Sequence, residues 1–270
     1  MPAGRFVLRA LAAQPQQPGA ELILPDEIAR QARDVLRLRT GDSLALLDGI
    51  GGEYPATIEQ LARREAHVIL GPRREGLPSP RPPLTLCIGM LKAAKLELIL
   101  QKGVELGVAV FQPLLTERSV SLAEEFSASK RRRYETIIAE ALEQCGGSWL
   151  PDLREPQPLG AALAAIPADT LALIPWERTP DQPLAATLRS QRARLNIAGV
   201  WLFIGPEGGF SAAEVELAQR HGALPVTLGR RILRAETAAL VAATLALEAL
   251  GALDSGPDAY YSGREKMNHI

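Results

Sequence analysis

The chain of 270 residues is long enough for two domains or for one large one. Its 47% of hydrophobic and 23% of charged residues are ordinary for a globular protein, and its net charge of −1 excludes nucleic-acid binding through overall charge alone. Two separated cysteines and three scattered histidines argue against a disulfide framework and a metal centre. The start lacks a signal-peptide core and no apolar run reaches the roughly 18 residues of a membrane span, so we expect a cytoplasmic protein without a membrane segment.

The first 72 residues read as a small β domain. Strand-like runs alternate with glycine-rich turns, and one helix-like stretch over 26–38 interrupts them. The strand-like runs cover 5–11, 20–25, 43–49 and 65–71. A small barrel over 1–72 fits this pattern, and residues 73–83, dense in Pro, Gly and Arg, read as a linker.

Residues 84–254 change to the rhythm of an α/β domain, because apolar strands now alternate with helical segments. This pattern is typical of βα units on a parallel sheet. The predicted strands cover 84–90, 108–115, 170–176, 200–205 and 224–229. The polar stretch 255–270 reads as a loose tail.

The stretch "IGPEGGFSAAE" (204–214) joins the end of a predicted strand to a well-specified helix start. Ser211 and Glu214 form the capping box S-x-x-E, and Phe210 and Val215 take the staple positions around it. The helix is expected to stop at Gly222, a usual residue after a helix end. Loops after the strands of open α/β sheets bind ligands, so this loop is a candidate site.

The ligand is predicted to be a nucleoside without phosphates. The phosphate-binding patterns GxxxxGK[ST] and GxGxxG are absent, and Glu207 would repel a phosphate on the loop. A second loop, "LGRRILRAETAAL" (228–240), combines an apolar wall with three arginines. Two apolar loops with exposed backbone suit a nucleoside ring gripped by main-chain groups, and an adenosine that carries a sulfonium would tolerate the glutamate.

"IGPEGGFS" followed by "LGRRILRAETA" resembles the signature of the RsmE-type family of ribosomal RNA small-subunit methyltransferases, which belongs to the SPOUT class. The resemblance also includes "VLRLRTGD", "DGIGGEYPATI", "QKGVELGV", "TERS" and "EALEQC", and so covers nearly the whole chain. The chain departs from the family pattern at Gln31, where a histidine is common, and at Gly146 and Gly147, near the usual place of an arginine.

The resemblance implies an α/β fold of the SPOUT type: a parallel sheet with a C-terminal trefoil knot, plus an N-terminal PUA-like β-barrel. It implies S-adenosylmethionine as cofactor, methylation of uridine N3 in 16S rRNA at uridine 1498, and a homodimer. The cofactor would lie bent against three knotted loops. Mapped onto this chain, they supply Leu173, Ile174, Pro175, Ile204, Gly205, Pro206, Gly208, Gly209, Leu228, Gly229, Ile232, Leu233 and Arg234.

The implied chemistry is displacement at the sulfonium methyl by uracil N3, which is mostly protonated at neutral pH. A carboxylate could act as base and an arginine could stabilise the developing anion. Glu207 and Glu236 are the candidate carboxylates, and Arg118 and Arg234 the candidate cations. Glu236 could equally be a helix-start residue favoured by the dipole, and Arg118 could pair with a neighbour.

Basic residues supply candidate RNA contacts. Lys92, Lys95 and Lys102 fall within roughly 80° of one another on a helical wheel, which makes a cationic stripe or simply a solvated helix face. Arg118 follows at a predicted strand end, and the N-terminal part adds Arg5, Arg9 and Arg37.

Three functions fit this reading. The first is the uridine N3 methyltransferase of 16S rRNA. The second keeps the fold and cofactor but acts on another RNA or on a ribose oxygen, and the third is an RNA-binding or ribosome-assembly protein without catalysis. Intact "GPEGG" and "LRAET" favour an enzyme over the third, and the resemblance in the N-terminal part favours the first over the second.

Overall fold

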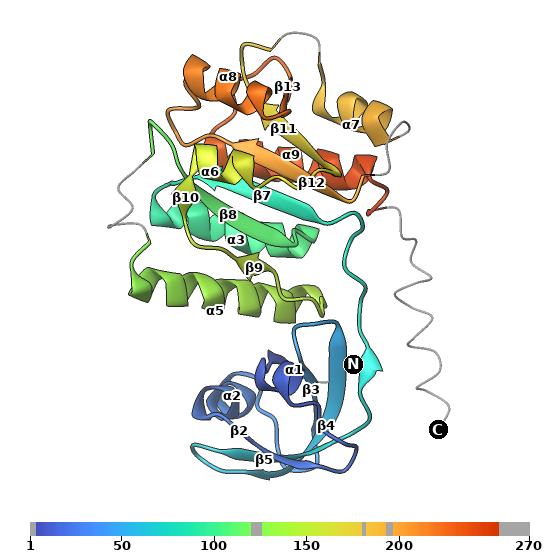
Figure 1. The fold of residues 1–270 in the computed structure, drawn as a ribbon. Helices are drawn as coiled ribbons and strands as arrows, with labels where there is room; N and C mark the ends of the chain where they lie inside the picture. The colour runs from blue at the N-terminus through green and yellow to red at the C-terminus, as the bar shows by residue number, and fades with distance from the viewer. Residues whose placement is uncertain (1–3, 120–125, 180–181, 193–196, 254–270) are drawn as a thin grey trace. The chain divides into compact units, whose positions relative to one another are not determined.

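A computed structural model describes residues 4–119, 126–179, 182–192 and 197–253 (Figure 1). The predicted tail at 255–270 lies outside these residues. Contacts divide the chain into two units, one of Met1–Ser79 with Arg132–Pro151, the other of Pro80–Arg131 with Asp152–Ile270. Within the described ranges, no helix has the length and apolarity needed to cross a membrane.

The first unit contains a mixed six-stranded sheet in the order β1-β3-β4-β5-β2, with β6 paired to β4. The first two strands in this order are parallel and the other pairs are antiparallel. The strands are β1 (Arg5–Val7), β2 (Glu21–Leu24), β3 (Ser43–Leu47), β4 (Gly52–Leu61), β5 (Ala66–Leu70) and β6 (Arg74–Glu75). The run predicted as strand over 5–11 ends early, because α1 (Ala10–Ala13) begins there.

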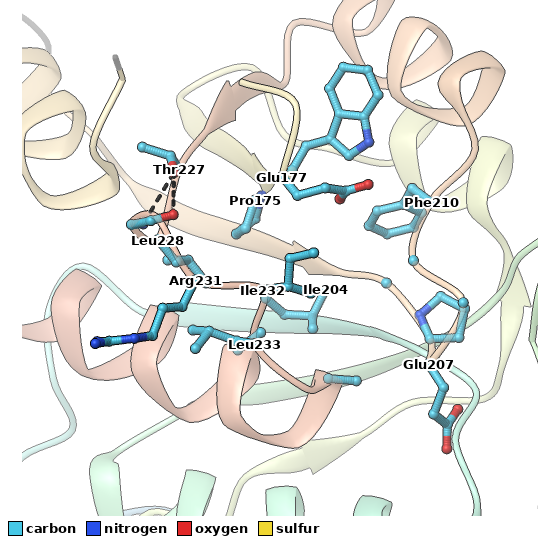
Figure 2. A pocket seen from close by; sticks show the side chains of 18 of the residues that line it. Pro175, Glu177, Ile204, Glu207, Phe210, Thr227, Leu228, Arg231, Ile232 and Leu233 are labelled. Atoms are coloured by element: carbon cyan, nitrogen blue, oxygen red, sulfur yellow. Dashed lines mark hydrogen bonds between the residues drawn. The ribbon is translucent and has the colours of Figure 1, made fainter. Parts of the chain in front are cut away.

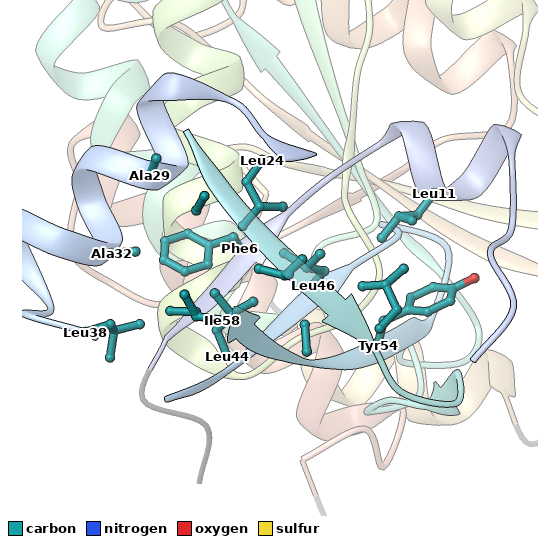
Figure 3. Close-up of a cluster of buried hydrophobic side chains, with 14 residues drawn as sticks. Phe6, Leu11, Leu24, Ala29, Ala32, Leu38, Leu44, Leu46, Tyr54 and Ile58 are labelled. Atoms are coloured by element: carbon teal, nitrogen blue, oxygen red, sulfur yellow. The ribbon is translucent and has the colours of Figure 1, made fainter. Parts of the chain in front are cut away.

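The predicted helix at 26–38 is confirmed as α2 (Asp26–Arg30) and a π-helical segment, η1 (Gln31–Val35). Alternating side chains of the strands fill one core with residues of α1, α2 and η1 (Figure 3). Phe6, Leu24, Leu46 and Tyr54 are among its fully buried members.

The second unit contains a seven-stranded parallel sheet in the order β10-β8-β7-β12-β11-β13, with β9 paired to β8. The five predicted strands are confirmed as β7 (Leu84–Gly89), β8 (Val110–Leu115), β11 (Thr170–Pro175), β12 (Gly199–Ile204) and β13 (Leu224–Val226). The two-residue strands β9 (Asp152–Leu153) and β10 (Gln157–Pro158) are too short to leave a sequence pattern.

Helices cover both faces of this sheet. Residues of α6 (Leu159–Ala164) and α8 (Ala212–Arg220) pack in one core with Cys87, Ile174 and Phe203. On the other side, α9 (Ala235–Ala249) contacts β7 and β12 and packs against α3 (Ala93–Leu106) and α7 (Leu184–Arg192). The helix α5 (Ala128–Cys145) begins within the second unit's residues and continues in the first unit's.

Candidate functional site

The sheet brings three loops together at one edge. Strands β12, β11 and β13 are adjacent and parallel, so the residues that follow them emerge on the same side. The loops surround a cavity of about 260 Å³ (Figure 2). The two loops singled out in the sequence, at 204–214 and 228–240, therefore form one pocket with the end of β11.

Most of the predicted cofactor residues line this pocket. They are Pro175, Ile204, Gly205, Pro206, Gly208, Gly209, Leu228, Gly229, Ile232 and Leu233. Leu173 and Ile174 are fully buried inside β11, and Arg234 is the exposed residue before α9, so these three do not line the cavity. The pocket also includes residues that the sequence reading did not assign to it: Trp176, Glu177, Phe210, Thr227, Arg230, Arg231, Ala235 and Ala238. Arg230 and Arg231 lie within the predicted loop 228–234, and the others except Ala238 directly adjoin or follow predicted residues in the sequence. Ala238 lies further along α9.

Glycines let the backbone of the first loop turn sharply and approach its neighbours. At Gly205 a Cβ atom would meet Gly209 and the nitrogen of Phe210 at 3.0–3.1 Å, and Gly209 itself has a φ of 66°. A Cβ on Gly89, at the end of β7, would lie 2.5 Å from Pro206 Cδ. The chain therefore needs glycine at position 205 for the loop to turn, and at position 89 for Pro206 to lie against the end of β7.

The predicted capping box at the start of α8 is confirmed. The backbone N–H of Glu214 donates to Ser211 Oγ at 3.3 Å, and that of Ser211 donates to Glu214 Oε2 at 2.9 Å. Phe210 and Val215 are buried in the same core, and Gly222, with a φ of 85°, follows the helix end as expected. The other oxygen of Glu214 accepts a hydrogen bond from the backbone N–H of Glu117 at 2.8 Å. The cap thus fixes the loop after β8 against the first pocket loop.

Arg118 lies on that fixed loop and contacts the pocket loop directly. Its Nη1 donates to the carbonyl oxygen of Gly208 at 2.8 Å, and the methylenes of its side chain pack against Gly208. The Arg118 side chain is otherwise exposed. A guanidinium has five N–H donors, so a cation stands at the rim of the pocket with donors to spare.

The two candidate carboxylates share one cation. Lys95 Nζ lies 3.2 Å from Glu207 Oε1 and 3.7 Å from Glu236 Oε2. Burial acts to raise the pKa of Glu207, but its own backbone N–H, Lys95 and the backbone of Lys92 outweigh burial and lower that pKa below its ordinary value. A carboxylate with a lowered pKa is a weaker base, and in Figure 2 the Glu207 side chain points away from Ile204 and Ile232.

The predicted RNA contacts have different surroundings. Arg9, Arg37 and Lys92 are exposed, whereas Lys95 is held by the two carboxylates and Lys102 pairs with Glu105 at 2.7 Å. In the first unit, the Arg5 guanidinium contacts Glu53 and donates to the carbonyl oxygens of Gly146 and Gly147. Arg5 therefore ties β1 to the segment that departs from the family pattern.

Among the described ranges, no group of three or more His, Cys, Asp or Glu side chains is placed to hold a metal ion. Cys87 is fully buried, which raises the pKa of its thiol well above the ordinary value, and Cys145 is a free thiol.

A parallel α/β sheet with a strand-end pocket, in a chain that also has a small mixed β unit, defines a two-unit protein of the α/β class with a candidate ligand pocket. Comparison with known families identifies the family to which the chain belongs. A family described as "RNA methyltransferase domain" matches residues 78–247, and one described as "RNA methyltransferase PUA domain" matches residues 24–71. The chain therefore belongs to the RNA methyltransferase family, and its first unit contains a PUA domain.

Individual relatives agree. Ribosomal RNA small subunit methyltransferase E of Synechocystis is 38% identical over 210 residues, which are 77% of this chain and 66% of that protein. The crystal structure of a ribosomal RNA small subunit methyltransferase E from Neisseria gonorrhoeae, bound to S-adenosyl methionine, is similar with a TM-score of 0.79 and 28% identity, over 91% of this chain and 97% of that one. A putative methyltransferase from Legionella pneumophila, in complex with the same cofactor, gives 0.77 and 32%, over 91% and 97%.

Proposed function

We propose that this protein is an S-adenosylmethionine-dependent methyltransferase that methylates N3 of a uridine in 16S rRNA of the small ribosomal subunit. One observation carries the proposal: three strand-end loops of an RNA methyltransferase domain form one pocket with glycine backbone, an apolar wall and an acidic residue. The names of the relatives support the rRNA of the small subunit as substrate, and the two similar structures with bound cofactor support the ligand.

The pocket residues fit S-adenosylmethionine better than a phosphate-bearing nucleotide. Ile204, Leu228, Ile232 and Leu233 offer an apolar wall for an adenine ring, and the glycines leave main-chain groups accessible for its polar edge. Glu177 adds negative charge to the lining, which suits a ligand with a sulfonium and an amino group. When bound, the cofactor supplies an electrophilic methyl group.

The protein's own residues bring uracil N3 to that methyl group and accept the proton that N3 loses. The nitrogen lone pair forms the new N–C bond, the methyl–sulfur bond breaks and its electrons leave with sulfur, and the N3 proton passes to a base. Arg118, fixed at the pocket rim by Glu214 and Gly208, is the cation that we place beside the developing charge on the uracil ring. Arg234 is the second candidate.

Of the two carboxylates, Glu236 is the better candidate base. Glu207 is held as a stabilised anion by Lys95 and backbone N–H groups, whereas Glu236 Oε2, which shares Lys95 at the longer distance of 3.7 Å, is buried and accepts no hydrogen bond from the described residues. Separate Glu→Gln variants at both positions test this role. A loss of kcat only in Glu236→Gln, with cofactor binding retained, supports the assignment, and unchanged kcat in both variants removes both residues from it.

We further propose a C-terminal trefoil knot, a closed PUA barrel, a homodimer and a cytoplasmic location. Pairing of β13 with β11, and not with the β12 that precedes it in the chain, is compatible with a threaded C-terminus. Native mass spectrometry would measure the assembly state.

Nucleoside mass spectrometry tests the function. Small subunits that lack the modification, and free 16S rRNA in parallel, are incubated with the protein and S-adenosylmethionine. We expect 3-methyluridine on the subunits. A different methylated nucleoside would move the target to another position, and cofactor binding without any methylated RNA would contradict the assigned substrate.

A further inference from the structure

A charge cluster of Lys95, Glu207 and Glu236 connects the two pocket loops, with Glu207 in the cavity lining and Lys95 and Glu236 outside it. Glu207 lies in the turn between β12 and α8, and Glu236 lies in the first turn of α9, directly after the loop 228–234. Lys95 reaches both from α3, with its Nζ 3.2 Å and 3.7 Å from their carboxylate oxygens. One side chain therefore links the two sides of the pocket.

The cation stands in an unfavourable place for its own helix. Lys95 is in the first turn of α3, where the helix dipole favours acidic residues over basic ones. By contrast, Glu236 is favoured by the dipole at the start of α9. The attraction between the Lys95 ammonium and its two carboxylate partners therefore offsets the unfavourable interaction with the helix dipole.

The cluster is shielded enough for its charge balance to matter. The Lys95, Glu207 and Glu236 side chains expose 30%, 32% and 15% of their surface. Glu236 Oε2 is buried and accepts no hydrogen bond within the described part of the chain, so the Lys95 ammonium compensates its charge. Without that ammonium, the cluster would hold two partly buried carboxylates and no cation, which is unfavourable.

We propose that Lys95 is a positioning residue that holds the two pocket loops at the separation needed for the cofactor, without touching the cofactor itself. The Glu207 side chain, to which Lys95 is paired, points away from the cavity walls formed by Ile204 and Ile232 (Figure 2). Loss of the cation would let the carboxylates repel and the loops separate, so that cofactor affinity would fall. The inference rests on the proposed function, because it takes S-adenosylmethionine as the ligand.

The test compares cofactor affinity by isothermal titration calorimetry in four variants. Lys95→Met keeps most of the side-chain stem and removes the charge, and Lys95→Arg keeps the charge. Lys95→Met combined with Glu207→Gln removes the cation together with the repulsion, and Glu207→Gln alone completes the cycle. Arg189→Met is the matched control, because Arg189 also pairs with a glutamate of α9, Glu248, near the opposite end of that helix.

We expect Lys95→Met to bind S-adenosylmethionine at least about tenfold more weakly, and Lys95→Arg and Arg189→Met to stay within about threefold of the wild type. The double variant should recover most of the lost affinity, a rescue that loss of packing would not give. Equal affinity of Lys95→Met and wild type, or a double variant weaker than both singles, would overturn the inference. If Lys95→Met does not fold, rescue of folding and affinity in the double variant supports it and failure of both overturns it. Absence of binding to the wild type would instead overturn the proposed function, and this inference with it.

Discussion

Gly89 shows how one missing side chain shapes the pocket. A Cβ atom there would lie 2.5 Å from Pro206 Cδ and 2.6 Å from Pro206 N, closer than side chains pack. The first pocket loop can rest on β7 only because the strand ends in glycine. The sequence offers no sign of this contact, since Gly89 and Pro206 are far apart in the chain and belong to different motifs.

Gly89→Ala should therefore push the loop away from β7. We expect a loss of about 1–3 kcal/mol in stability and a fall of about tenfold or more in affinity for S-adenosylmethionine. Calorimetric titration and thermal unfolding measure the two effects. Gly160→Ala is the control, because a Cβ there meets only Leu217 at an ordinary 3.8 Å. Equal behaviour of the two variants would show that the loop does not depend on this contact.

Glu143 in the first unit links stability to pH. Burial, together with Glu140 and Glu27, raises its pKa from 4.5 to about 7, against the opposing effects of the Val7 N–H and Arg5. The Val7 N–H donates to its carboxylate at 2.8 Å. Since the folded state favours the protonated acid, the stability that Glu143 contributes is complete below its unfolded pKa and is lost as the pH rises towards and through about 7.

Glu143→Gln should remove this loss, because the amide oxygen can still accept from Val7. We expect the variant to be more stable than the wild type at pH 8 by about 1 kcal/mol, after discounting for partial exposure of the carboxylate, and to lose that advantage near pH 4.5. Thermal unfolding at both pH values measures it. The exposed Glu216→Gln is the control. A variant that is less stable at pH 8 would contradict the raised pKa.

At the scale of elements, the start of α8 does two tasks with one glutamate. Glu214 caps the helix through Ser211 and also accepts the Glu117 N–H from the loop after β8. The cap could be predicted from S-x-x-E alone, because it is local. The contact with Glu117 could not, because it depends on how β8 and β12 are ordered in the sheet.

Two substitutions separate these tasks. Ser211→Ala should cost about 1 kcal/mol of stability through the lost cap. Glu214→Ala should cost a similar amount and also lower kcat, because the loop that carries Arg118 loses its anchor. Unfolding curves and methyl-transfer kinetics measure both. Equal kcat values in the two variants would show that Arg118 does not depend on Glu214 for its position.

The difference between local patterns and contacts set by the sheet also explains which strands could be predicted from the sequence. All five strands predicted in the parallel sheet are present, and two of them, β7 and β12, are the continuous apolar runs that are typical of strands buried on both faces. The longest strand of the first unit, β4, was not predicted, because it starts at glycine-rich "GIGG" and contains Pro55. Its alternating burial becomes recognisable only once β3 and β5 lie on either side.

At the scale of the whole molecule, most of the pocket could be predicted, but its charge arrangement could not. The strand-end loops are contiguous motifs, and parallel strands bring their ends together by rule. Lys95, by contrast, read as part of a cationic stripe on α3, and only the packing of α3 against α9 brings it to Glu236. Pairings between distant charges have no sequence signature.

The two units contain different functional residues. The second unit contains the pocket and every candidate catalytic residue. The first contains the PUA domain with Arg37 exposed, and Arg9 is exposed in the part of this unit that precedes the PUA match. Substitutions of these two arginines should therefore weaken binding to rRNA and leave the affinity for S-adenosylmethionine unchanged. Filter binding of rRNA at several salt concentrations would measure the affinity for rRNA and its dependence on salt. A loss of cofactor affinity would contradict the division.

The proposed activity can be measured as transfer of an isotopically labelled methyl group from S-adenosylmethionine to unmodified small subunits, followed by digestion and mass spectrometry of the nucleosides. We predict that the label appears in uridine at N3, identified by co-elution with authentic 3-methyluridine, and that Arg118→Ala lowers the rate by about 100-fold. Label in another nucleoside, or on the ribose, would contradict the assigned target. No label in any nucleoside, with cofactor bound, would contradict the assignment of this protein as the rRNA methyltransferase.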